Sequence, residues 1–164
     1  MNLKKKSSEI NLLLHLIDQA YDKKAWHGTN LRGSIRGLTI EEALWRPASG
    51  RHNIWEIVVH AAYWKYIVRR RTLGEKKGSF PLKGSNWFPR GDGLSAADWR
   101  RDVALLEETH RSIREAVAML TPKKLQLTPA GSKVSNLAII HGIASHDLYH
   151  AGQIQLLKRL QSKS

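Results

Sequence analysis

Residues 135–160 read SNLAIIHGIASHDLYHAGQIQLLKRL, and this stretch decides the fold. Apolar side chains recur in it at steps of three and four residues, which is the period of one face of an α-helix. His146 and His150 share that face with Leu137, Ile140, Ile143, Ile154 and Leu157. Two imidazoles four residues apart lie one turn apart on a helix and can converge on one metal ion. The stretch therefore predicts a core-facing helix that carries two metal ligands.

A second helix with a histidine on its apolar face is predicted from about Asn53 to Arg71. Asparagine is a favoured N-cap residue, and the arginines at 69–71 would place cations in the last turn, where they suit the helix dipole. His60 lies on the apolar face of this helix together with Ile57, Trp64 and Ile67. A third imidazole is thus expected in the same core.

Two more stretches show the helical period, from Glu9 to about Trp26 and from Ser95 to Leu120. A capping-box pattern at residues 39–42 predicts a short helical turn before Pro47. No segment alternates convincingly as a strand does, so the sequence predicts an all-α four-helix bundle. We expect one domain over residues 1–164 with its core at about 9–160. Long connections follow the first and second helices, so an up-down-up-down order does not follow from the sequence.

The three histidines, His60, His146 and His150, are the candidate metal ligands. A single core histidine is more often a hydrogen-bonded core residue than a ligand, but burying several imidazoles together is costly unless something satisfies their lone pairs. Three imidazoles around a zinc-type or nickel-type ion leave room for water or substrate, as in a catalytic site. The H-x3-H spacing lacks the glutamate of a zincin motif, so protease chemistry is not indicated.

Several other side chains are candidates for the surroundings of this site. Glu56 and Asp147 could each accept the second ring N–H of a ligand histidine, and the simpler alternative is that both are solvent-facing charges. Tyr149 and His27 are candidates for a proton-transfer role, although no general acid or base follows from the sequence. His27 and His52 are also expected to line a pocket. The remaining histidines are expected at the edge of the core or at the surface: His15, His110 and His141.

Composition limits the function classes. The 164 residues include no cysteine, which excludes disulfides and thiolate metal sites. Lys and Arg number 27 against 14 Asp and Glu, a formal net charge of +13, but the basic residues are dispersed and no nucleic-acid-binding signature accompanies them. Most of the six tryptophans are expected to pack in the protein rather than stack on bases. No apolar stretch has the length of a signal or membrane span, so we expect a cytoplasmic protein without membrane contact.

Three segments resemble the DinB-like superfamily of metal-binding four-helix bundles: EEALWRP at 41–47, HNIWEIVVH at 52–60 and HDLYHAGQI at 146–154. The resemblance implies an up-down-down-up bundle and frequent homodimers. It also implies that His60, His146 and His150 bind a divalent metal, zinc or nickel. Characterised members of this family are thiol-dependent transferases that use bacillithiol, mycothiol or related low-molecular-weight thiols.

The sequence leaves three functional hypotheses. The first is a metal-dependent enzyme, a thiol-dependent S-transferase or hydrolase acting on a small electrophile, with a low-molecular-weight thiol as co-substrate. The second is a non-catalytic, basic stress-response module with a structural metal that binds nucleic acid or an acidic partner. The third is a family member that keeps the metal and has lost catalysis.

Overall fold

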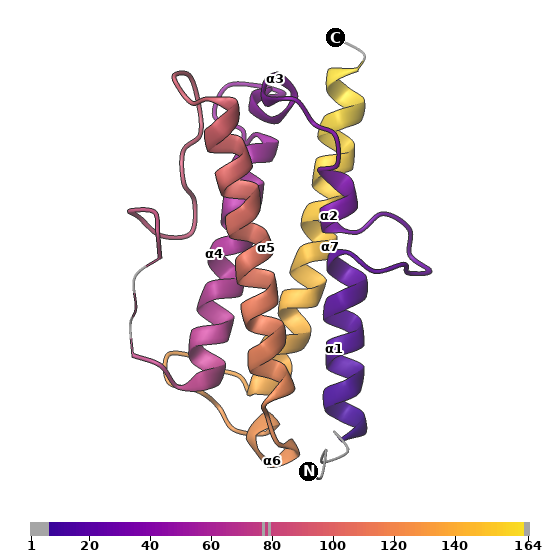
Figure 1. The fold of residues 1–164 in the computed structure, drawn as a ribbon, viewed down its shortest axis with the longest axis vertical. Coiled ribbons are helices and arrows are strands. Elements are labelled where there is room, and N and C mark those ends of the chain that lie inside the picture. The colour runs from indigo at the N-terminus through magenta and orange to yellow at the C-terminus, as the bar shows by residue number, and fades with distance from the viewer. Residues whose placement is uncertain (1–6, 77, 79, 163–164) are drawn as a thin grey trace.

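The computed structural model describes residues 7–76, 78 and 80–162, and every regular element in that part of the chain is a helix. The long helices are α1 (Ser8–Tyr21), α4 (Ile54–Leu73), α5 (Ala96–Ala118) and α7 (Asn136–Gln161). The short ones are α2 (Leu31–Ser34), α3 (Ile40–Leu44) and α6 (Pro122–Leu125). None of these helices is long and apolar enough to cross a membrane. The predicted all-α four-helix bundle is confirmed (Figure 1).

The long helices run up, down, down and up in chain order (Figure 1). Helices α4 and α5 pack closely against each other, and α7 contacts both α1 and α4. Because α4 and α5 point the same way, residues 74–95 must return along the bundle, and Figure 1 shows this connection running up the outside of α4. The order that the family resemblance implied is therefore the observed one.

Local capping interactions explain where the helices begin. The side chain of Asn53 accepts the backbone N–H of Glu56 at 2.8 Å, which caps α4. Thr39 with Glu42, and Ser95 with Asp98, form reciprocal capping boxes at the starts of α3 and α5. These starts agree with the sequence prediction to within one residue.

The first helix ends earlier than predicted. Helix α1 stops at Tyr21 rather than near Trp26, because residues 22–24 are charged and exposed and a longer helix would bury no further apolar side chain. Trp26 is fully exposed, so the expectation of a packed tryptophan is wrong at this position. The loop aromatics behave as expected, since Phe88 is buried and Trp87 is partly buried against the core.

His110 is buried, which corrects its expected surface position. It shares one face of α5 with Leu106, Ile113 and Val117, at helical steps of four, three and four residues. Its ring stacks on that of Tyr21 with centroids 3.7 Å apart. The charged residues around His110 in the sequence lie on the other faces of the helix. His15, expected at the edge of the core, is exposed.

Candidate metal centre

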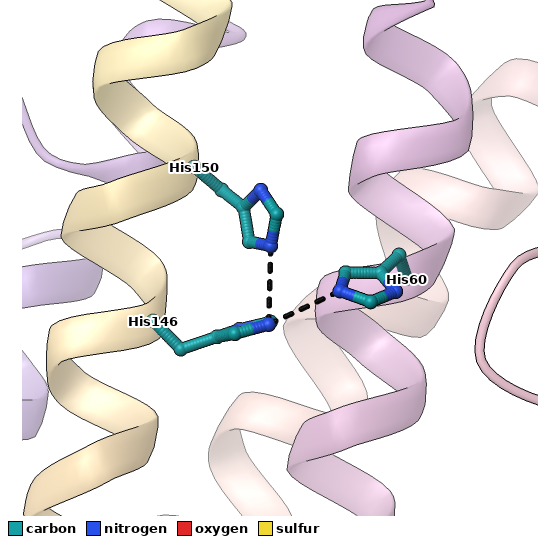
Figure 2. A group of neighbouring side chains, drawn as sticks. All are labelled: His60, His146 and His150. Atoms are coloured by element: carbon teal, nitrogen blue, oxygen red, sulfur yellow. Dashed lines mark hydrogen bonds between the residues drawn. The ribbon is translucent and has the colours of Figure 1, made fainter. Parts of the chain in front are cut away.

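Helices α4 and α7 bring three imidazoles together at the centre of the bundle. Figure 2 shows His60 on α4 facing His146 and His150 on α7. The Nε2 atom of His146 lies 3.1 Å from Nε2 of His60 and 3.1 Å from Nε2 of His150. One ligand atom from each ring falls within 4.8 Å of the other two. The residues predicted from separate helices thus form one cluster.

The Nδ1 atoms of two of these rings, which face away from the cluster, form hydrogen bonds to carbonyl oxygens. His60 Nδ1–H donates to the backbone oxygen of Asn86 at 2.8 Å, and His150 Nδ1–H donates to Oε1 of Gln153 at 2.7 Å. In the neutral rings the Nε2 lone pairs of His60 and His150 therefore both point to the centre. Only His146 could place a proton between them, and its own Nδ1 is buried with no described partner. A cation could satisfy lone pairs that converge in this way.

Burial keeps the three rings neutral. It lowers the pKa of His60, lowers that of His146 to about 3 and lowers that of His150 to about 4, and the neighbouring histidines add to the effect on His146. A metal ligand must be an unprotonated imidazole, so the cluster is ready to bind an ion at neutral pH without first losing protons.

The donor set fits a divalent transition metal. Ligand nitrogens at about 2.0–2.1 Å from zinc in tetrahedral geometry lie about 3.3 Å apart, close to the observed spacings. Among residues 7–76, 78 and 80–162, no fourth His, Cys, Asp or Glu joins the group. Three histidines without a fourth protein ligand leave a coordination position open, as in catalytic rather than structural sites.

The connection after α4 supports His60 from outside the helices. Asn86 supplies the carbonyl that binds His60, and its side chain accepts the indole N–H of Trp64 at 2.9 Å. The backbone of Asn86 adopts the left-handed conformation, with φ 63°. The ring of Trp87 stacks on His60 with centroids 3.9 Å apart, and its other neighbour in the stack is His52 at 3.6 Å. A candidate metal ligand is therefore oriented by an irregular loop.

Comparison with known proteins identifies the family. A family model described as the DinB superfamily matches residues 24–154, which include all three histidines. The chain belongs to the DinB superfamily. Neither a curated protein nor a solved structure matches the chain. The match establishes the family and its helical bundle, and this DinB-superfamily protein has a buried histidine triad that could hold a metal ion.

Glu56 is neither a solvent-facing charge nor in contact with a triad histidine. Its carboxylate, only 5 % exposed, accepts two hydrogen bonds from Arg46, at 2.6 and 3.0 Å, one from His52 at 2.8 Å and one from the backbone N–H of Arg90 at 3.1 Å. Burial alone would raise the pKa of Glu56, but these donors hold it at about 2. Glu56 thereby anchors the connection that carries Asn86 to the start of α4.

Asp147, the other predicted orienting carboxylate, also faces away from the triad. It is buried and pairs with the ammonium of Lys65, which is equally buried on α4. Burial raises the pKa of Asp147, and the Lys65 charge opposes part of that rise. On α7, Asp147 follows His146 directly, so a 100° step of the helix turns its side chain toward a different neighbour.

The remaining candidates fall at different distances from the triad. His27 is exposed in the connection after α1, and no described contact joins it to the three histidines. Tyr149 is 64 % exposed, and its ring lies edge-on to that of His150 with centroids 5.1 Å apart. His52 lines a cavity of about 400 Å³, as expected for a pocket residue.

Two pockets adjoin the candidate metal centre. The cavity that His52 lines has mainly apolar walls and includes Trp87 and Gln153, which contact His60 and His150. A smaller groove of about 180 Å³ is lined by His146 itself, with Trp64, Ile143 and Arg71 among the other lining residues. The sequence analysis found His52 but missed Gln153, whose position three residues after His150 was the available signal. Asn86 and Trp87 had no such signal, since they lie in an irregular connection.

Proposed function

We propose that this protein is a metal-dependent enzyme, a thiol-dependent S-transferase or hydrolase that acts on a small electrophile. The observation that carries the proposal is the inward convergence of three neutral imidazoles with no fourth protein ligand in the described chain. A divalent ion held by His60, His146 and His150 would supply Lewis acidity, which makes a thiol or water acidic enough to be a nucleophile at neutral pH.

The residues around the triad would contribute orientation and binding. Asn86 and Gln153 fix the ring orientation of His60 and His150, a role that typically affects metal affinity and activity strongly. The apolar cavity beside Trp87 would bind the body of the electrophile, with Arg51 available for an anionic group. The groove at His146 would admit the thiol or water. Two pockets at one centre suit a reaction between two small molecules.

Elemental analysis is the primary test of the site. Untagged protein purified without chelators should contain about one transition metal per chain. His150→Ala should lose it, whereas His141→Ala should keep it, because His141 is exposed on the same helix. Metal-free wild-type protein after reconstitution with zinc and nickel would refute the assignment. The metal bound in this test identifies which ion to use in the assays.

Activity is tested on the reconstituted protein with a panel of small thiols and electrophiles. Thiol transfer or hydrolysis should occur in wild type and His141→Ala and should be absent in His150→Ala. Stoichiometric metal without any such reaction would leave the non-catalytic family member as the better description. A homodimer remains a prediction, to be measured by light scattering.

The formal charge of +13 favours one alternative, a binding module for nucleic acid or an acidic partner. Binding through phosphates would weaken steeply with added salt and would not require His150. Tight, salt-sensitive DNA or RNA binding by His150→Ala, together with no thiol chemistry in wild type, would favour the module over the enzyme.

A further inference from the structure

A third cavity, with largely polar walls, lies along the C-terminal half of α4, beneath the connection that follows the helix. Its volume is about 440 Å³, and its walls include Tyr63, Tyr66, Arg70 and Arg71 of α4 and Phe80 of the connection. None of these residues is a member of the histidine triad, although Arg71 also lines the groove at His146. The cavity therefore needs its own explanation.

The two arginines of this cavity have no carboxylate partner among the described residues. Their neighbour Arg69 pairs with Glu75 at 2.6 Å. Arg70 reaches only the backbone oxygen of Glu75, at 3.4 Å, and no side-chain hydrogen bond of Arg71 is found in the described part of the chain. Two adjacent guanidinium groups thus border one cavity without a counter-charge.

Buried donors at the cavity are also unsatisfied. The Nε atoms of Arg70 and Arg71 and the hydroxyl of Tyr66 are buried and lack a hydrogen-bond partner in the described protein. An unsatisfied buried polar group destabilises the folded protein, and more so when it is charged. An anion in the cavity would offset the two guanidinium charges, and guanidinium groups match the geometry of phosphate.

The size and aromatic walls of the cavity narrow the ligand class. A space of about 440 Å³ is much larger than a free phosphate and falls within the usual range of small-molecule sites. The rings of Tyr63 and Phe80 pack edge to face with centroids 5.3 Å apart, and Tyr66 lies beside Phe80 at 5.5 Å. We propose that this cavity binds a small phosphomonoester, with the phosphate on Arg70 and Arg71 and an aromatic body against Tyr63 and Phe80. The proposal does not depend on metal chemistry.

Calorimetric titration with phenyl phosphate, inorganic phosphate and phenol tests the proposal. The titrations use His150→Ala as the background, so that phosphate bound to a metal at the triad cannot contribute. Phenyl phosphate should bind most tightly, inorganic phosphate more weakly and phenol not measurably. Arg70→Ala and Arg71→Ala should each weaken phenyl phosphate binding about tenfold or more, as expected for the loss of a charge-assisted hydrogen bond.

Matched variants separate a specific site from general attraction to a basic protein. Arg36→Ala removes an exposed arginine outside the cavity and should leave the affinity unchanged. Arg70→Lys keeps the charge without the guanidinium fork and should bind less tightly than the parent protein. Thermal unfolding by circular dichroism confirms that each variant is folded. Absence of binding at millimolar phenyl phosphate, equal weakening by Arg36→Ala, or binding only in protein with an intact histidine triad would each overturn the proposal.

Discussion

Asp147→Asn should destabilise the protein strongly, because it leaves the ammonium of Lys65 inside the bundle without a counter-charge. Both side chains are only 1 % exposed, and each is the ion-pair partner of the other. The ammonium lies 5.1 Å from the centre of the Tyr21 ring, and this contact replaces only part of the lost interaction. The pair joins α4 to α7, the helices that carry the three histidines.

The expected loss is about 3–5 kcal/mol, the usual cost of removing one partner from a buried pair. Such a loss is a large part of the roughly 5–15 kcal/mol that stabilises a typical protein. The melting temperature should fall by roughly 6–20 °C for a chain of this length.

Urea unfolding followed by circular dichroism measures this effect. Lys65→Met should resemble Asp147→Asn, whereas the double variant Lys65→Met/Asp147→Leu should recover most of the loss, because it strands no charge. Glu108→Gln is the matched control, since it breaks an exposed pair with Arg111 and should cost less than about 1 kcal/mol. A loss below about 1 kcal/mol in both single variants, or a double variant no more stable than either, would refute the reasoning.

Three further changes test other parts of the structure. Burial, followed by the charge of Lys65, lowers the pKa of His110 to about 2. The contribution of neutral His110 to stability should therefore be lost progressively as the pH falls below the unfolded pKa of about 6.5. The loss should reach about 2 kcal/mol near pH 5 and should be absent in His110→Phe. Urea titrations at both pH values measure it, and equal acid sensitivity of the two proteins would contradict it. Gln153→Ala should weaken metal binding about 10–100-fold in a competition titration, while Gln155→Ala should not; the prediction fails if both bind equally. Asn86→Gly should keep metal affinity because the backbone carbonyl and the left-handed φ are retained. Asn86→Val should weaken metal binding about 5–30-fold through strain of about 1–2 kcal/mol, and equal affinity of the two variants would argue against a positioning loop.

The helices could be predicted because their signals are local. The period of apolar residues and the caps at Thr39, Asn53 and Ser95 act within a few residues of each other, and all three caps are present in the structure. The end of the first helix was predicted less well, since Ala25 and Trp26 continue the period although Trp26 is fully exposed. Periodicity indicates which face is apolar, but a neighbouring element must be present to cover it.

The surroundings of the triad could be predicted only in part. Spacing placed His146 and His150 on one face, yet the partners of Glu56 and Asp147 come from distant parts of the chain. Glu56 is bound by Arg46 and by the backbone of Arg90, and Asp147 by Lys65. A single sequence does not show which of many charges meet, so these buried carboxylates looked like surface residues.

By itself, the sequence determined the helical bundle, the starts of its long helices and the identity of the three convergent histidines. Helical periodicity and capping are properties of short segments, and histidines that face the core from two such helices were expected to lie close together. Only the tertiary structure decided which groups orient those histidines, which charges are buried and where the cavities lie. These features depend on contacts between residues far apart in the chain, above all on the path of the connection after α4, and irregular backbone carries no period from which that path could be calculated.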